Sequence, residues 1–351
     1  MSLIGKRTIP FIAFLLFLVA CNAASPTAIP SEQIVAPPIE PTLLQPTVTS
    51  LPTQVPTTVP APTETQTLSP TSPPLGGSGV LVFGSNRDGD FMNIYLLTTS
   101  DGSVTRLTMG DSNTFPGPFS PDGKQLLFTG FGLTKSFVGL MNANGTDPVD
   151  LSDRPTVDEG FPTWSPDRQQ IAFTSRMDGN NEIYTMDVDG TNIKRITNNP
   201  ADDFAPAWSP DGSQIAFVSD RDNPTGVNNL YVMKGDGSGV VRLTNRNEID
   251  YGPAWSPDGK QIAFRADIEG NGDIFVINAN GSGRVNLTND PASDWAPAWS
   301  PDGTLIAFQT NRDGNWEIYV MHSDGSEPTN LTHNPADDQM PNWKPVLTST
   351  N

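Results

Sequence analysis

The stretch Ala205-Pro-Ala-Trp-Ser-Pro-Asp-Gly-Ser-Gln-Ile-Ala-Phe217 decides the fold, because close copies of it recur at 252–264 and 296–308 and looser copies at 116–128 and 161–173. The aromatic residue at the centre of each copy returns every 44 to 47 residues, at Phe119, Trp164, Trp208, Trp255, Trp299 and Trp343. A fixed period in this range is typical of proteins built from blade repeats.

Each copy predicts four short strands separated by turns. In the unit of Trp208 we expect strands at Pro206–Trp208, Gln214–Ser219, Leu230–Met233 and Val240–Thr244. The Ser-Pro-Asp-Gly segment has the residues of a tight turn, and the Asp-Gly or Asn-Gly pair before the fourth strand favours a two-residue hairpin. Four antiparallel strands in about 44 residues predict one propeller blade.

The ends of the repeat region predict how the ring closes. The region begins with a second strand, Val80–Ser85, and finishes with a first strand, Pro341–Val346. Joining them into one composite blade removes an open edge between the ends of the ring. The sequence therefore predicts an all-β, six-bladed propeller of four-stranded blades.

The repeat also resembles a known family. The unit Pro-x-Trp-Ser-Pro-Asp-Gly-x-x-Ile-Ala-Phe, followed by Ile-Tyr-x-Met and Leu-Thr, is similar to the WD40-like repeat of TolB-type β-propellers over residues 78–346. The resemblance implies a six-bladed propeller and an envelope location. TolB-like periplasmic proteins carry a small α/β domain before the propeller, whereas we expect an anchor and a stalk in its place here.

The N-terminus predicts export. Lys6 and Arg7 precede an apolar run at 11–20, which is too short for a comfortable membrane span. Leu18-Val-Ala-Cys21 resembles the lipobox of bacterial lipoproteins, so we predict a signal peptide at 1–20 and lipidation of Cys21. The alternative is a plain secretory signal. Either way the localisation is extracytoplasmic, with the lipid holding the chain on a membrane.

Residues 21–76 predict a disordered linker. Residues 22–76 hold 13 of the 34 prolines and neither Lys nor Arg. Such a segment has too little apolar surface to offset its chain entropy and stays extended. The propeller then occupies 77–346 and a short tail 347–351.

Charge and cysteine content exclude some classes of partner and bond. The net charge of −19 argues against nucleic acid, because phosphate binding requires a basic surface. The single cysteine precludes an intramolecular disulfide. We expect a monomer whose membrane contact is the lipid and whose partner is an envelope protein or peptide.

The sequence does not predict an enzyme. It has only two histidines, His322 and His333, and no Gly-x-Ser-x-Gly elbow. The serines of the Ser-Pro-Asp turns recur five times, which indicates a structural role. Asp-Gly-Asn turns such as 178–180 lack the spacing of a calcium loop, so hairpins explain them better. We predict no cofactor, calcium being the one ion considered, and leave a metal site undetermined.

One recurring position is a candidate binding site. Five acids stand five residues before the central aromatic residue, at Glu159, Asp203, Asp250, Asp294 and Asp338, while the first blade has Thr114. Because the first strand of a propeller blade is innermost, these acids are expected to ring one mouth of the central channel, with Phe204 and Trp295 beside them. Such a ring could bind a cation or a basic peptide. The alternative is that each acid caps the turn that enters its own blade.

These features leave three hypotheses for function. The first is a non-enzymatic, membrane-tethered scaffold that binds a protein or peptide. The second is a surface lipoprotein that binds a cation or glycan at the acidic channel mouth. The third is a hydrolase of the propeller type. Because a fold does not define a function, the site must distinguish them.

Overall fold

The computed structural model describes residues 66–67, 79–152, 154, 157–222, 227–245 and 248–346. The chain divides into the units Met1–Glu64 and Thr65–Asn351, and all described residues belong to the second. The predicted signal peptide, Cys21, most of the predicted linker and the tail lie outside the described residues. Within the described part, no helix is long and apolar enough to span a membrane.

The described unit consists of six antiparallel sheets, each of which is one blade named here by its innermost strand. The inner strands are β5 (Thr114–Phe119), β9 (Glu159–Trp164), β13 (Asp203–Trp208), β17 (Ile249–Trp255), β21 (Asp294–Trp299) and β25 (Asp338–Trp343). The second strands are β2 (Val80–Ser85), β6 (Gln125–Phe131), β10 (Gln170–Ser175), β14 (Gln214–Ser219), β18 (Gln261–Ile268) and β22 (Leu305–Thr310).

The outer strands complete each blade. The third strands are β3 (Asn93–Thr98), β7 (Ser136–Asn142), β11 (Glu182–Asp187), β15 (Asn229–Lys234), β19 (Asn271–Asn278) and β23 (Glu317–His322). The fourth are β4 (Ser103–Arg106), β8 (Val149–Asp150), β12 (Lys194–Arg195), β16 (Val241–Arg242), β20 (Val285–Asn286) and β24 (Thr329–Asn330). A two-residue strand from the predicted linker, β1 (Gln66–Thr67), pairs with β4 at the edge of the β25 blade.

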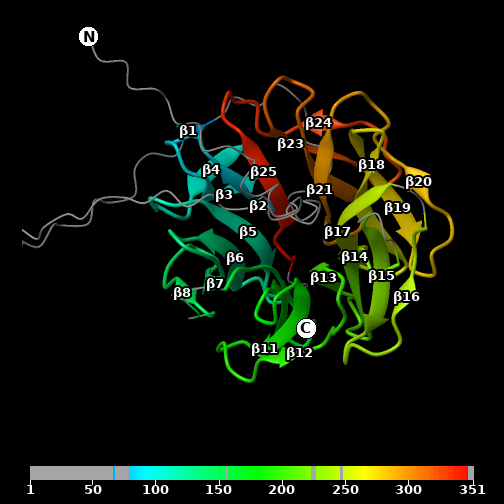
Figure 1. The fold of residues 1–351 in the computed structure, drawn as a ribbon. Coiled ribbons are helices and arrows are strands. Elements are labelled where there is room, and N and C mark those ends of the chain that lie inside the picture. Colours follow the sequence, from blue (N-terminus) through cyan, green and yellow to red (C-terminus); the bar gives the residue numbers. More distant parts are fainter. Residues whose placement is uncertain are drawn as a thin grey trace, which may run out of the picture. The chain divides into compact units, whose positions relative to one another are not determined.

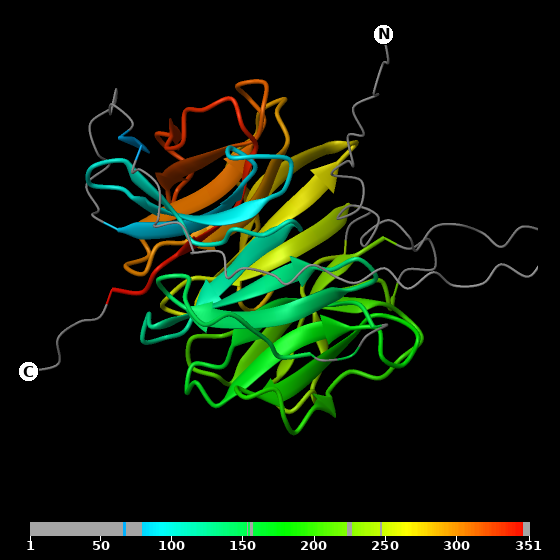
Figure 2. The same ribbon diagram turned by 90° about the vertical axis from the view of Figure 1, so that its left-hand side faces the viewer.

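The blades form a closed ring. Each inner strand contacts the inner strands of the two neighbouring blades, and β25 contacts β5. Figure 1 shows the colours running once around this ring until β25, in red, lies beside β2, and Figure 2 shows the sheets from the side. In the composite blade β25 pairs with β2, with Ser85 opposite Asp338 and Leu81 opposite Trp343. The predicted six-bladed propeller with its composite blade is confirmed.

Strand boundaries differ from the prediction in three strands of the Trp208 unit and in the closing strand. The third strand of that unit, Asn229–Lys234, has one more residue at each end, and the closing strand is Asp338–Trp343 where Pro341–Val346 was predicted. The inner strand β13 begins at Asp203, three residues before the predicted start, and β16 is reduced to Val241–Arg242. The inner strand was underestimated because a bulge interrupts its alternation: Ala205 has a φ of 51° and the register with β14 shifts between Phe204 and Ala207. A residue in the left-handed region does not continue a period-two pattern.

The recurring tryptophans pack between blades. Trp255 lies among residues of its own blade and of the preceding one, including Leu230 and Val232, and its indole Nε1 donates to the carbonyl oxygen of Ala207 at 3.0 Å. Trp299 likewise packs against Ile274 of the preceding blade. Burial of such large aromatic side chains supplies much of the force that holds neighbouring sheets together.

The Ser-Pro-Asp-Gly turns have the predicted structural role. In all five, the serine hydroxyl donates to the aspartate at 2.6 or 2.7 Å. These hydrogen bonds lower the pKa of each aspartate, that of Asp258 to about 2, with the serine as the largest cause. In one turn Arg168 takes the glycine position with a φ of 63°, and it forms an ion pair with Asp122 of the neighbouring blade.

Candidate functional site

The five acids predicted as a binding ring all lie at one end of the inner strands. Four are the first residue of their strand and Asp250 is the second residue of β17, while Thr114 begins β5. All five are buried, with at most 2% of their surface exposed. The structure thus gathers the predicted residues at the same end of the ring, but it covers their carboxylates. Whether they contact a partner remains a prediction.

An arginine neutralises the buried acid in three blades by the same geometry. In the β25 blade, Arg87 donates from Nη2 to both oxygens of Asp338, at 3.0 and 2.9 Å. Its guanidinium carbon lies 5.0 and 5.1 Å from the ring centroids of Phe83 and Tyr95. Equivalent pairs are Arg221–Asp203 and Arg312–Asp294. Desolvation nevertheless raises the pKa of Asp338, which shows how completely the carboxyl group is removed from water.

The β9 blade reaches the same arrangement with an arginine from elsewhere in the sequence. Met177 occupies the position of Arg87, and Arg154, from the loop before β9, donates instead from Nε and Nη2 to Glu159 at 2.7 and 2.9 Å. A buried carboxylate therefore has a cation beside it even where the repeat has lost the usual one, as the cost of burying an unpaired charge requires.

Asp250 is held differently. Ile268 replaces the usual arginine, and the hydroxyl of Thr244 donates a hydrogen bond to the Asp250 side chain. Arg284 is the cation that lowers its pKa by charge, but its own ion pair is with Glu248. Desolvation dominates and raises the pKa of Asp250 to about 7. Among the five acids, Asp250 therefore has the weakest charge compensation from the described residues.

A second set of buried polar groups was missed by the sequence analysis. Near its start, the third strand carries a buried acid in three blades, Glu182, Asp273 or Glu317, at the position where the other blades have Asn93, Phe137 and Asn229. Thr332 donates to Glu317, and the amide of Asn334 donates to the same carboxylate at 3.0 Å. Burial raises the pKa of Glu317. The repeated words Asn-Pro-Ala-Asp-Asp at 199–203 and 334–338 are the sequence signal that accompanies this layer.

The Asp-Gly-Asn turns hold neighbouring loops together. The side-chain amide of Asn315 donates to Glu317 at 3.1 Å and to the carbonyl oxygen of Ala336 at 2.7 Å. Asp313 accepts the hydroxyl of Tyr319 at 2.5 Å. These contacts fit the structural interpretation of the turns. Among the described residues, no group of three or more His, Cys, Asp or Glu side chains is placed to hold a metal ion.

Next to the acids, three adjacent blades present an aromatic arc, defined as Phe204, Tyr251 and Trp295. Their ring centroids are 6.4 Å apart from Phe204 to Tyr251 and 5.4 Å apart from Tyr251 to Trp295. The guanidinium of Arg265 lies 3.7 Å from the centroid of Trp295 and forms an ion pair with Asp267 at 2.8 Å. Tyr251 and Trp295 are partly exposed. Phe204 and Trp295 were predicted to lie beside the acids, whereas Tyr251 and Arg265 were not predicted.

The two histidines do not meet. His322 ends β23, where its Nε2 lies 3.4 Å from Glu327. His333 is exposed in the loop that follows β24, beside residues that contact Glu317 at the start of β23. They therefore lie at opposite ends of one strand and cannot form a single catalytic dyad.

Comparisons with known proteins agree with this geometry. Residues 118–224 match the family model described as the TolB beta propeller domain. A protein TolB homolog of Chlorobium luteolum is 33% identical over 117 residues, which are 33% of this chain and 26% of that protein, so the alignment spans about a quarter of the relative's length.

Solved structures extend the match to the whole ring. TolB from Acinetobacter baumannii has a TM-score of 0.65 at 23% identity, covering 76% of this chain and 67% of the other. An oligogalacturonate lyase in complex with manganese has a TM-score of 0.51 at 19% identity, covering 72% and 73%. At these identities the likeness concerns the fold. Together with the family match over residues 118–224, it shows a six-bladed β-propeller that is similar to the propellers of TolB proteins.

Proposed function

We propose that this protein is a non-enzymatic scaffold outside the cytoplasm that binds an envelope protein or peptide at the end of the inner strands where the acids lie. The proposal includes a lipid at Cys21 as its membrane tether, which rests on the sequence pattern around that residue. Similarity to TolB propellers supports the envelope setting.

The observation that carries the proposal is the aromatic arc. Tyr251 and Trp295 are only partly buried, and with the buried Phe204 they form a continuous series of ring contacts across three adjacent blades. Tyr, Trp and Arg are the residues that most often dominate the free energy of protein–protein binding. Arg265 stacks on Trp295 and so holds one ring in a fixed orientation. A preorganised aromatic surface loses little side-chain entropy when a partner binds.

For the five acids we propose a supporting role in that site. Each is buried against an arginine or a threonine, so direct contact with a partner would require the loss of an internal ion pair or hydrogen bond. By holding the ends of the inner strands in place, they position the next residue of each strand, which includes all three members of the arc. This arrangement favours a protein or peptide over a free cation.

The binding site can be tested by crosslinked affinity capture from the native envelope with the full chain. We expect Trp295→Ala to reduce recovery of the partner on the order of tenfold, because loss of a central aromatic contact commonly has that effect or a larger one. Met109→Ala is the matched control, since Met109 is 70% exposed in the loop before β5 but lies outside the arc. Both variants must retain the wild-type thermal transition. Equal recovery by all three proteins would remove the arc from the site.

The tether is tested separately. Metabolic labelling with a radioactive fatty acid should mark the wild-type protein and leave Cys21→Ser unlabelled. The same fractionation should release Cys21→Ser from the membrane while its propeller remains folded. Membrane retention without label would contradict lipidation and favour a plain secretory signal.

A further inference from the structure

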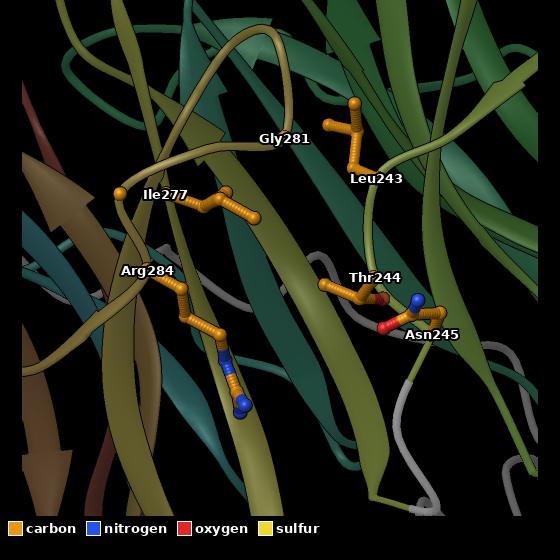
Figure 3. A pocket seen from close by; sticks show the side chains of 7 residues that line it. Leu243, Thr244, Asn245, Ile277, Gly281 and Arg284 are labelled. Carbon is orange, nitrogen blue, oxygen red and sulfur yellow. The ribbon is translucent and has the colours of Figure 1, made fainter.

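A pocket of about 380 Å³ lies at the boundary between the β13 and β17 blades, and none of its lining residues belongs to the aromatic arc. This volume falls within the range of small-molecule sites. Figure 3 shows Leu243, Thr244 and Asn245 on one side and Ile277 and Arg284 on the other, with the backbone of Gly281 above. The walls thus combine two aliphatic side chains with a polar end.

The repeat supplies an internal control for this pocket. At four other boundaries the hairpin before the fourth strand presses on the preceding blade: a Cβ added to its glycine would lie 2.2 to 2.7 Å from a leucine or isoleucine carbonyl oxygen. The glycines concerned are Gly145, Gly190, Gly237 and Gly325. At Gly281 the corresponding distance to Leu243 is 3.3 Å. The hairpin at Gly281 therefore lies farther from the preceding blade than the other four hairpins do, and the pocket lies at this boundary.

Arg284 accounts for the change. Its position, four residues before the Thr or Ser that follows the fourth strand, is occupied by Val104, Pro148, Ile193, Val240 and Pro328 in the other blades. The Arg284 guanidinium carbon lies 4.1 Å from the ring centroid of Phe275, which replaces the tyrosine found in four blades. The Arg284 side chain, which comes from just before the fourth strand, therefore lies over Phe264 and Phe275. Arg87 occupies the equivalent position over the aromatic pair of the β25 blade.

One donor in this pocket lacks an acceptor. The Nε of Arg284 is buried and has no hydrogen-bond partner, while its Nη2 is engaged by Glu248. A buried donor without a partner costs free energy, and a ligand that supplies an acceptor would recover it. Asn245, which is exposed beside it, can both donate and accept.

The charges select an uncharged ligand. Glu248 already neutralises Arg284, and Asp250 lies close enough for its charge to be coupled to both. The ion pair therefore leaves Arg284 with little net attraction for an added anion, and it leaves Glu248 with little net attraction for an added cation. An uncharged carbonyl oxygen satisfies the free donor, and a methyl group beside it matches Leu243 and Ile277.

We propose that this pocket binds the N-acetyl group of an amino sugar, with the carbonyl oxygen accepting from Arg284 and the methyl group between Leu243 and Ile277. The sugar hydroxyls face the open side, where Asn245 hydrogen-bonds to them. This site is separate from the aromatic arc and does not depend on it.

Saturation-transfer NMR on the full chain tests the proposal with N-acetylglucosamine as the probe and glucose as the matched control. We expect an affinity on the order of 1 mM, as befits a ligand of this size, with the strongest signal from the acetyl methyl protons. Glucose should give a signal at least about fivefold weaker, because it lacks the acceptor and methyl pair.

Two variants locate the site. Arg284→Val restores an aliphatic residue of the kind other blades use, and Leu243→Phe fills the pocket without removing a charge; each should abolish the acetyl signal while the thermal transition persists. If Arg284→Val does not fold, Leu243→Phe decides the question. An absent acetyl signal in the wild type, an equal signal from glucose, or a signal that survives in a folded Leu243→Phe variant would each overturn the proposal.

Discussion

The boundary between the β21 and β25 blades and the boundary between the β13 and β17 blades each contain a buried acid, but its charge is compensated in different ways. Both place an acid, Asp338 or Asp250, on the inner strand beside a threonine of the preceding blade, Thr332 or Thr244. At the first, Arg87 bonds directly to the acid. At the second, the cation is Arg284, which pairs with Glu248 and lines a pocket.

The difference shows what the repeat conserves within this chain. The conserved feature is a place for a cation over a pair of aromatic rings, next to a buried carboxylate. The residue that supplies the cation can change from Arg87, after the second strand, to Arg284, just before the fourth strand. A buried acid requires charge compensation, but it does not specify where in the sequence the compensation originates.

The largest contrast between the two boundaries should appear on removing each acid. We expect Asp338→Ala to lower the free energy of unfolding by about 3 kcal/mol, because it leaves the largely buried Arg87 without its carboxylate. Asp250→Ala should cost about 1 kcal/mol, since Arg284 keeps Glu248. Urea unfolding measures both. Replacing Arg87 by Met in the Asp338→Ala background should recover part of the loss, and equal costs for the two single variants would refute the distinction.

The pH dependence of stability should separate the same two acids. The pKa of Asp250 is raised from 3.8 to about 7, so between these values the folded protein keeps a proton that the unfolded chain has lost. Stability then falls with rising pH, by up to about 1.4 kcal/mol per unit from this group. Asp250→Asn mimics the protonated acid and should flatten the wild-type curve of unfolding free energy between pH 5 and 7. Other buried acids contribute equally to the curves of the wild type and of Asp250→Asn, so the difference between the two curves is the quantity to measure. Parallel curves would contradict a raised pKa for Asp250.

A smaller effect should distinguish the bulges of the inner strands. Gly252 of β17 has a φ of 55°, the conformation that Ala205, Ala296 and Met340 adopt in other blades. A Cβ at Gly252 would meet no atom within 4 Å, so a substitution there is opposed by backbone strain alone. Gly252→Val should cost about 1 kcal/mol and Gly252→Ala less. Thermal unfolding can rank them, and a neutral Gly252→Val would show that the bulge relaxes.

The smallest effect should come from the Ser-Pro-Asp turn of the β9 blade. Arg168 has a φ of 63° where four sister turns have glycine. Arg168→Gly relieves this strain but loses a largely exposed ion pair with Asp122, so we expect a gain of about 0.5 kcal/mol. Gly212→Ala in a sister turn is the matched control and should destabilise. A loss of stability in Arg168→Gly would show that the ion pair outweighs the strain.

Much of the fold could be predicted because its information is local. The second strands at Val80–Ser85 and Gln214–Ser219 were predicted to the residue, since alternation and flanking turns define them. The inner strands were predicted too short because the bulge positions hold residues such as Phe161 and Ala205, which have a positive φ but are not glycine. The sequence therefore gives no signal of the bulge. In β5 the bulge lies one residue later, since Pro116 cannot adopt a positive φ.

The candidate site was predicted in position but not in environment. The spacing to the central aromatic residue placed the five acids at one end of the ring, because equal positions in equal repeats occupy equivalent places. It could not show that Arg87, Arg154, Arg221 and Arg312 neutralise four of them, since these arginines do not all stand at the same distance from their acids along the chain: Arg87 and Asp338 are 251 residues apart.

By itself the sequence determined the repeat, the number of blades, the turns and the closure of the ring, because each depends on residues that are neighbours along the chain. The tertiary structure alone decided which acids are buried, which cations reach them, how the aromatic arc forms across three blades and where a hairpin withdraws to leave a pocket. Those features depend on contacts between blades, where small differences among similar repeats accumulate and the period in the sequence does not reveal them.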